Sequence, residues 1–141
     1  VQTSLNLGTA YLDADKLVYK YLIRSNTAAG KKLLLERVTT FVKHLSRKVV
    51  TMSDYPAWEY KSDSQLRKIC VDSFTNVYGH EPEVTSIHAG LECGILAGKM
   101  SGVDMISFGP TLESVHTPDE CMDVASVERT WEYLLEILKS L

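Results

Sequence analysis

Two extended runs, separated by a short turn, constrain this chain more than any other feature of its sequence. In residues 16–24 the odd positions are all apolar or aromatic, whereas Lys20 and Arg24 stand at even positions. This alternation predicts a half-buried antiparallel strand. Residues 3–12 have an extended pattern too, and Asp13-Ala14-Asp15 between the runs suits a turn because Asp tolerates turn conformations. We therefore predict an antiparallel hairpin at the start of the chain.

A helix is predicted directly after the hairpin, over residues 28–47. Asn26 or Thr27 can cap it. Residues 49–52 then have the pattern of another short strand. The order strand, strand, helix, strand is part of a split βαβ unit, in which a helix covers one side of an open sheet. The apolar stripe of the predicted helix has helical spacing and consists of Leu34, Val38, Phe41, Val42 and Leu45.

The composition changes at residues 53–58 (SDYPAW), which we interpret as a domain boundary. We predict one piece over residues 1–53 and a second over 54–141. Ser62 and Gln65 form a capping box for a helix that ends at Gly79, with Pro82 beyond it. The core positions expected in that helix are Leu66, Ile69, Cys70, Phe74 and Val77.

The pattern that follows is typical of an α/β fold. It predicts strands at residues 84–88 and 103–108, and a glycine-flanked turn at 89–94 that enters a short helix ending near Gly98. A loop then extends to about Cys121, and Ser126 caps a last helix. The predicted class is thus α/β, with an α+β piece first and an α/β piece second. The expected apolar face of the last helix is Val127, Trp131, Leu134, Leu135 and Leu138.

Composition excludes several classes of function. The hydrophobic fraction is 45% and the net charge is −3, so nothing predicts disorder or a basic surface for nucleic acid or an anionic membrane. No apolar run approaches the roughly 20 residues that span a bilayer. The three cysteines, Cys70, Cys93 and Cys121, are widely spaced, which argues against a disulfide framework or zinc finger and favours a reducing, cytoplasmic compartment.

His116 is the first candidate for chemistry, because it lies on a loop beyond a predicted buried strand. Sites in open α/β sheets form beyond the carboxyl ends of strands. A neutral imidazole there is a good zinc ligand, and Asp119 or Glu120 could orient a neighbouring group. The alternative is a surface histidine followed by a Pro-Asp-Glu helix entry.

The segment 87–94 is the second candidate. A strand that enters a glycine-flanked turn and a helix N-terminus exposes N–H groups that bind carboxylates and phosphates. His88 and Glu92 could form a polar pair or act as ligands; otherwise the glycines serve the turn and His88 only closes the strand. In a third interpretation Cys93 is a nucleophile with His88 or His116 as its base.

Asn6 and Arg24 lie on adjacent predicted strands. If the hairpin brings them close together, an amide and a guanidinium form a carboxylate-binding pair. The alternative is an exposed arginine and a turn-forming asparagine.

Taken together, these segments resemble a known family. The series SIHAGLECG (86–94), DMISFGP (104–110), HTPDE (116–120) and ASVER (125–129) closely resembles the C-terminal part of the aminoacyl-histidine dipeptidases, also called Xaa-His dipeptidases or PepD. The segments TSLNLG (3–8), IRS (23–25) and SDYPAW (53–58) are similar to that family too. The resemblance covers essentially all of the chain, and the combination of segments is specific.

The resemblance implies a cytosolic metallopeptidase that hydrolyses dipeptides, notably those ending in histidine. Its α/β catalytic domain would hold two zinc ions, with manganese or cobalt as other working metals. A lid domain with a split βαβ sheet would make a homodimer contact. By position, His116 matches a zinc ligand, Asn6 and Arg24 match lid residues near the substrate carboxylate, and the 90–94 turn lines the substrate pocket. The expected substrate-binding residues are thus Asn6, Arg24, His88, Gly90 and Glu92.

One departure from the family is serious. The family's other zinc ligands and its general-base carboxylate belong to an N-terminal half that these residues do not match. A catalytic zinc takes about three protein ligands, so His116 alone cannot hold it. We therefore expect the C-terminal portion of a longer enzyme, inactive alone and containing no catalytic general base. The alternatives are a free-standing binding or dimerisation module and, with less support, a Cys93 hydrolase.

Overall fold

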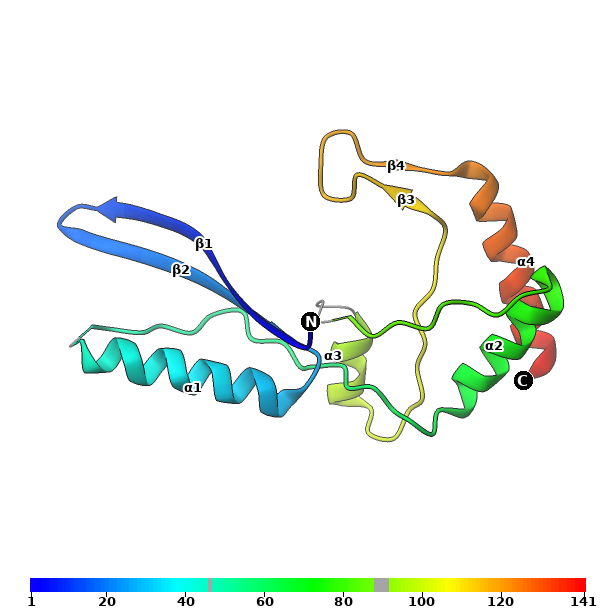
Figure 1. Ribbon diagram of the computed structural model, residues 1–141, viewed down its shortest axis with the longest axis horizontal. Helices are drawn as coiled ribbons and strands as arrows, with labels where there is room; N and C mark the ends of the chain where they lie inside the picture. The colour runs from blue at the N-terminus through cyan, green and yellow to red at the C-terminus, as the bar shows by residue number, and fades with distance from the viewer. Residues whose placement is uncertain (46, 88–91) are drawn as a thin grey trace. The chain divides into compact units, whose positions relative to one another are not determined.

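The computed structural model describes residues 1–45, 47–87 and 92–141. The chain packs as two compact units, one of residues 1–61 and 85–103 and the other of residues 62–84 and 104–141. The predicted domain boundary at residue 53 stays a prediction. The elements in chain order are β1 (Thr3–Asp13), β2 (Lys16–Ser25), α1 (Ala28–His44), α2 (Gln65–Tyr78), α3 (Glu92–Lys99), β3 (Leu112–Glu113), β4 (Cys121–Met122) and α4 (Val124–Ser140) (Figure 1).

The predicted hairpin is confirmed. β1 and β2 pair antiparallel from Thr3 opposite Ser25 to Asp13 opposite Lys16, so the turn consists of Ala14 and Asp15. Ala14 has a left-handed backbone with φ 49°. The register shifts between Leu7 and Thr9, which is a β-bulge, and bulges increase the local twist of a strand pair.

The register separates an apolar face of the hairpin from a polar one. Opposite pairs such as Leu5 with Ile23 and Leu7 with Tyr21 share the apolar face. The polar face carries Lys20, whose ammonium lies 5.3 Å from the centre of the Tyr11 ring. A two-stranded ribbon covers little surface, so most of its apolar side chains are exposed. Those exposed on the apolar face are Leu5, Leu7, Leu12, Leu17, Tyr19 and Tyr21.

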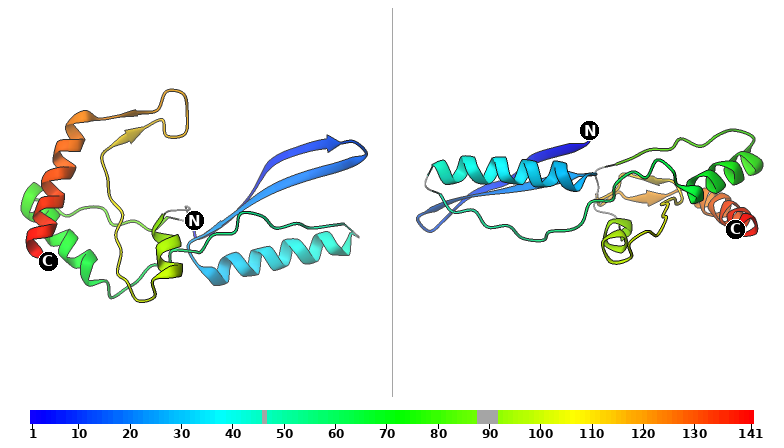
Figure 2. Two further views of the ribbon diagram at one scale, coloured as in Figure 1. Left: turned by 180° about the vertical axis from the view of Figure 1, so that it is seen from behind. Right: turned by 90° about the horizontal axis from the view of Figure 1, so that it is seen from below.

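α1 begins where expected and runs beside the hairpin (Figure 2). Thr27, one of the two predicted caps, accepts a hydrogen bond from the Gly30 N–H at 3.2 Å. The helix ends at His44, short of the predicted residue 47. Phe41, expected in the apolar stripe, is 66% exposed. The predicted strand at residues 49–52 is wrong: these residues are described and form no ladder, and a strand exists only where a partner accepts its hydrogen bonds.

α2 confirms the predicted C-terminus and corrects the predicted N-terminus. Gly79 caps it in the left-handed conformation with φ 74°, which glycine adopts without steric cost. The N-cap, however, is Ser64 and not Ser62: the Ser64 hydroxyl accepts from the Arg67 N–H at 3.0 Å. A carboxylate oxygen of Asp104 accepts from both the Ser64 hydroxyl and the Leu66 N–H. This distant carboxylate supplies a second cap, which a local capping-box motif does not reveal.

The predicted strands at residues 84–88 and 103–108 are not strands in the part of the chain that the structure describes. Residues 84–87 and 103–108 pair with no neighbouring strand there, and His88 lies outside the described residues. The predicted loop before Cys121 instead contains the short hairpin of β3 and β4, in which Leu112 pairs with Met122. None of the described helices is long and apolar enough to cross a membrane.

α4 buries a different face from the one predicted. Asp123, not Ser126, is its N-cap, and its carboxylate accepts from the Ala125 N–H. The buried positions are Ser126, Tyr133 and Ile137. Tyr133 and Ile137 form a small core with Cys70 of α2, against which Leu66, Ile69 and Phe74 pack as predicted. The predicted face is largely exposed, with Trp131 at 58% and Leu138 at 57%.

A pair of adjacent residues tests which face of α4 is buried. Ile137→Ala should lower the free energy of unfolding by about 2–5 kcal/mol, because it leaves a cavity in the core shared with α2. Leu138→Ala should change it by less than about 1 kcal/mol, since that side chain is mostly exposed. Chemical denaturation of both variants measures the difference, and equal losses would contradict the burial described above.

Candidate functional site

The candidate site residues are distributed over both units. Asn6, Arg24 and Glu92 belong to the first unit, and His116 belongs to the second. His88 and Gly90, both predicted to bind substrate, lie outside the described residues.

His116 lies in the loop that joins β3 to β4. Its backbone N–H donates to a carboxylate oxygen of Glu120 at 2.7 Å, and its side chain is exposed. Thr117 closes the turn twice, because its N–H and its hydroxyl both donate to the Ser114 carbonyl oxygen. Glu120 thus orients the backbone of His116, whereas the sequence suggested that it could orient a neighbouring side chain. The loop holds His116 by its backbone and leaves the imidazole accessible.

The backbone of this loop is strained at two places. Ser114 and His116 have φ angles of 51° and 66°, in the left-handed region that residues with a Cβ seldom occupy. Such conformations persist only where surrounding contacts impose them, and they cluster at functional sites. The left-handed angles and the hydrogen bonds around His116 therefore show a loop held by its own contacts, and the functional role of His116 stays a prediction.

His116 has no set of neighbouring ligands in the described residues. Those residues contain no group of three or more His, Cys, Asp or Glu side chains that could hold a metal ion. A catalytic zinc takes about three protein ligands. The described residues therefore do not form a catalytic metal site by themselves, and the role of His116 as a metal ligand stays a prediction.

Asn6 and Arg24 share the polar face of the hairpin. Asn6 lies opposite Leu22 and Arg24 lies opposite Ser4, so the two residues are diagonal neighbours across the strands. Diagonal neighbours are about 7–8 Å apart, a gap that an arginine side chain can span. Both side chains are exposed. The hairpin thus brings Asn6 and Arg24 close together, as a carboxylate-binding pair requires. That the pair binds a carboxylate stays a prediction.

Glu92 begins α3, and two glycines fix where that helix lies. The turn predicted to end at Gly94 ends earlier, because Gly94 is inside the helix and buried. A Cβ on Gly94 would lie 2.8 Å from the Pro56 carbonyl oxygen, and one on Gly98 would lie 2.9 Å from the Pro56 ring. This contact was not predicted, although glycines four residues apart share one face of a helix and signal close approach.

Cys93 lies on α3 beside Glu92 and is half-buried. One of its two suggested bases, His88, lies outside the described residues. The other, His116, belongs to the other unit. A Cys93 nucleophile therefore stays a prediction.

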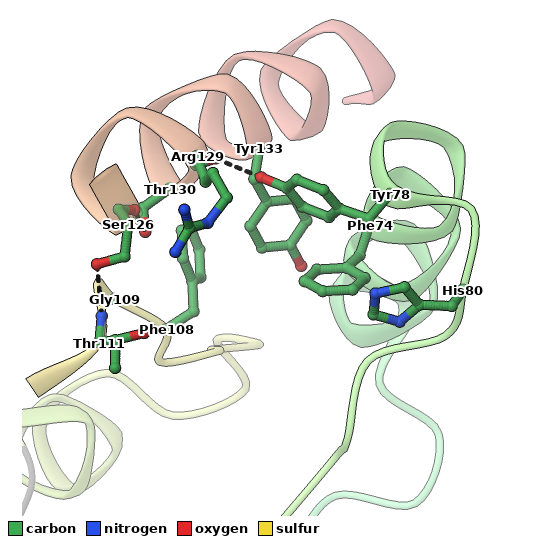
Figure 3. A pocket seen from close by; sticks show the side chains of 10 residues that line it. All are labelled: Phe74, Tyr78, His80, Phe108, Gly109, Thr111, Ser126, Arg129, Thr130 and Tyr133. Atoms are coloured by element: carbon green, nitrogen blue, oxygen red, sulfur yellow. Dashed lines mark hydrogen bonds between the residues drawn. The ribbon is translucent and has the colours of Figure 1, made fainter. Parts of the chain in front are cut away.

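An open aromatic groove of about 290 Å³ lies within the second unit (Figure 3). The Tyr133 ring meets Phe74 and Phe108 edge-on, with ring centres 5.3 and 4.9 Å apart. Burial raises the pKa of the Tyr133 phenol, whose O–H donates to the Cys70 carbonyl oxygen. Desolvation likewise raises the pKa of the Cys70 thiol. Phe74 and Cys70 were predicted in a core, but this groove was not predicted. It is lined by Phe74, Tyr78, His80, Phe108, Gly109, Thr111, Ser126, Arg129, Thr130 and Tyr133.

The junction between β4 and α4 connects the groove to the β3–β4 hairpin, which carries His116. Ser126, predicted as a cap, instead accepts from the Thr111 N–H at 2.8 Å and donates to the Asp123 carbonyl oxygen. The Asp123 carboxylate accepts from the Arg129 guanidinium at 2.9 Å. That hydrogen bond is the largest cause of a pKa of Asp123 below its usual 3.8, and the Ala125 N–H contributes.

Residues 8–140 match the peptidase family M20/M25/M40, and the chain belongs to this family. Over all 141 residues it is 31% identical to the cytosol non-specific dipeptidase of Escherichia coli K12, and it spans 29% of that relative's length. The crystal structure of aminoacylhistidine dipeptidase from Vibrio alginolyticus matches with a TM-score of 0.84 at 32% identity, over 100% of this chain and 29% of that one. These findings confirm the predicted resemblance.

A more distant solved structure shares the fold. Aminopeptidase PepT from Bacillus cereus matches with a TM-score of 0.73 at 16% identity, over 99% of this chain and 40% of that one. Together the two structures confirm the predicted α/β class.

The contact between α3 and Pro56 can be tested with matched glycine substitutions. Gly94→Ala should destabilise the protein by about 1–3 kcal/mol, because its methyl group collides with a backbone oxygen that cannot move alone. Gly109→Ala should change the free energy of unfolding by less than about 0.5 kcal/mol, since no neighbouring atom lies within 4 Å of its Cβ position. Thermal unfolding of both variants gives the comparison, and a neutral Gly94→Ala would refute the close contact.

The lowered pKa of Asp123 predicts that the stability of the protein falls at acidic pH. Its folded pKa lies below its unfolded pKa, so its stabilisation is complete above about pH 4 and is lost as the pH falls through the folded value. Asp123→Asn should therefore lose less stability than the wild type between pH 7 and pH 3. Arg129→Ala should also lose less stability than the wild type between pH 7 and pH 3, because it removes the main cause of the lowered Asp123 pKa. Denaturant midpoints at the two pH values test this. If both variants lost as much stability as the wild type between pH 7 and pH 3, the prediction would be contradicted.

Proposed function

We propose that this chain is the C-terminal portion of a cytoplasmic, metal-dependent dipeptidase that hydrolyses Xaa-His and related dipeptides. The observation that carries the proposal is the match of the whole chain to the aminoacylhistidine dipeptidase structure. The name of the Escherichia coli relative, a cytosol non-specific dipeptidase, supports the same reaction and compartment.

In this proposal His116 supplies one bond to the catalytic metal. The two ions of the complete enzyme are zinc, with manganese or cobalt as alternatives. A bound metal ion of this kind activates water and polarises the peptide carbonyl group. The β3–β4 hairpin contributes by holding the His116 backbone through Glu120 and by exposing the imidazole. The general base and the other ligands come from residues that this chain does not contain.

The remaining proposed roles concern the dipeptide substrate. Arg24 and Asn6 bind its terminal carboxylate from the polar face of the hairpin, where a guanidinium can donate two parallel hydrogen bonds. Glu92, at the start of α3, binds the substrate together with His88 and Gly90. These groups orient the peptide bond rather than break it, and orientation lowers the barrier by removing motional freedom before reaction.

The assay that tests this proposal compares two proteins. One is the 141-residue chain, and the other is the product of the complete reading frame. Each is given an Xaa-His dipeptide with and without a chelator. We expect chelator-sensitive hydrolysis from the longer protein alone, because one histidine cannot hold a catalytic metal. Chelator-resistant hydrolysis by the short chain would instead indicate Cys93.

Substitution of His116 in the longer protein tests the proposed metal ligand. His116→Ala should reduce turnover by more than about 100-fold and leave the fold intact. His116→Asn should do the same while tolerating the left-handed backbone at this position. The matched control is His44→Ala, in the exposed last turn of α1. Normal turnover in either His116 variant, measured with saturating metal, would remove the assignment.

A binding or dimerisation module is the second candidate. The exposed apolar face of the hairpin favours it, since contiguous exposed apolar side chains mark interaction surfaces. Both strands also have an unpaired edge among the described residues, and such edges accept further strands. The proposed partner is a second copy, giving a homodimer. Hydrolysis by neither protein in the assay above would favour this module over the peptidase.

A further inference from the structure

Residues 104–108 of the second unit form an extended segment whose side chains alternate as they do in a β-strand. Figure 1 shows this segment as part of the open run that leads into β3. The Asp104 carboxylate accepts two hydrogen bonds at the N-terminus of α2. Ile106 packs against the core that α2 and α4 share, and the centre of the Phe108 ring lies 4.9 Å from that of Tyr133. Contacts at every second residue have the period of a strand.

The backbone of this segment is unpaired among the described residues. Neither the N–H nor the C=O groups of residues 105–108 form a hydrogen bond there. Pairing resumes at Thr111, which donates to the Ser126 hydroxyl and accepts from the Asp123 N–H. Ile106 is nevertheless half-buried, and buried backbone groups are almost always paired because an unpaired one has a cost in free energy. The segment therefore has the side-chain contacts of a strand and lacks only a neighbouring strand.

The residue types of the segment indicate which kind of strand it is. Met105, Ile106 and Phe108 make it mostly apolar, and strands covered on both faces of a sheet have nearly continuous apolar runs. The contacts described above place α2 and α4 on one face. Ser107, on the opposite face, is exposed. Both the backbone and one face of the segment are thus available to further structure.

The aromatic groove adjoins the end of this segment. Phe108 and Gly109 both line it (Figure 3). Phe108 is 43% exposed even though its ring meets Tyr133 edge-on. A strand that pairs beside Phe108 can bury an apolar side chain there, which adds the hydrophobic effect to the main-chain hydrogen bonds. The partner that fits this surface is therefore an extended, largely apolar segment.

The lengths of the relatives indicate where such a segment comes from. Among its described strands the second unit has only β3 and β4, which are two residues each and pair with one another. The chain spans only 29% of the Escherichia coli relative. It matches the Vibrio alginolyticus structure with a TM-score of 0.84 over 29% of that chain. The same local fold therefore occurs within a much longer polypeptide, most of which lies outside the matched part.

We propose that residues 104–108 are a strand of a sheet whose other strands belong to the longer polypeptide. An apolar extended segment from outside this chain pairs with the backbone of residues 105–108. This inference rests on the proposed function, because it takes the chain to be a portion of a longer enzyme. Under it, the second unit is completed by main-chain hydrogen bonds as well as by apolar packing.

The first test is amide hydrogen exchange in the product of the complete reading frame and in the 141-residue chain. Residues 105–108 should exchange at least about 100-fold more slowly in the longer protein, because their N–H groups are then in a ladder. The internal control is α2, whose amides bond within their own helix in both proteins. Fast exchange of residues 105–108 in the longer protein would overturn the proposal. Slow exchange in the short chain that appears only at high protein concentration would do so too, because the partner would then be a second copy.

The second test removes single backbone donors from the longer protein. Consecutive N–H groups of a strand point to opposite edges, so Ile106→Pro and Ser107→Pro examine one edge each. Their matched controls are Ile106→Ala and Ser107→Ala, which shorten the side chain and keep the N–H. At least one proline variant should unfold at a midpoint about 5 °C or more below its alanine control. If both proline variants matched their controls, no strand would pair here and the proposal would fail.

Dipeptide hydrolysis, measured on the same preparation of the longer protein, separates this inference from the proposed function. Chelator-sensitive hydrolysis together with fast exchange at residues 105–108 would overturn the strand and leave the dipeptidase proposal standing. Slow exchange without hydrolysis would support the strand and count against the dipeptidase.

Discussion

The unpaired N–H groups at helix N-termini organise much of this chain, because its buried apolar core is small. Carboxylates distant in sequence satisfy two of these termini: Glu59 accepts from the Ala28 N–H of α1, and Asp104 accepts from the Leu66 N–H of α2. Such bonds combine a hydrogen bond with a favourable charge at the positive end of the helix dipole. They attach loop segments to helices without requiring deep burial. Lys31 adds to the first junction by pairing with Asp54 and donating to the Tyr55 carbonyl oxygen.

The elements that the sequence predicts well are those with local causes. The hairpin follows from alternation around two turn residues, and the end of α2 follows from a glycine that accepts a left-handed backbone. Errors occur where the cause is distant. The true cap of α2 depends on Asp104, about forty residues away, which no local motif identifies. The predicted strand at residues 103–108 is mostly apolar, but a ladder needs a neighbouring strand, and none pairs with it among the described residues.

The candidate site shows the same division between local and distant causes. Residue types and a family resemblance are the basis on which His116, Arg24 and Asn6 were chosen, and their roles stay predictions. They could not predict that His116 has a left-handed backbone held by Glu120, because a φ angle depends on the closure of a hairpin that the sequence pattern did not reveal. For α4, apolar spacing selected a face with Trp131, whereas burial follows Tyr133 and Ile137. Several apolar stripes compete on such a helix, and the packing partner decides between them.

In the proposed function the substrate is a dipeptide, and its small size makes the position of each binding group matter. Two residues span at most about 7 Å, so a terminal carboxylate and the adjacent peptide carbonyl are only about one residue length apart. In the proposed function Arg24 binds the carboxylate, and a misplacement of about 1 Å at a positioning group can cost on the order of 100-fold in rate. Arg24 lies on an exposed two-stranded hairpin with little apolar burial to hold it. The contacts that hold the base of the hairpin are instead short hydroxyl hydrogen bonds, which Thr3, Ser25 and Thr27 make at the end of β2.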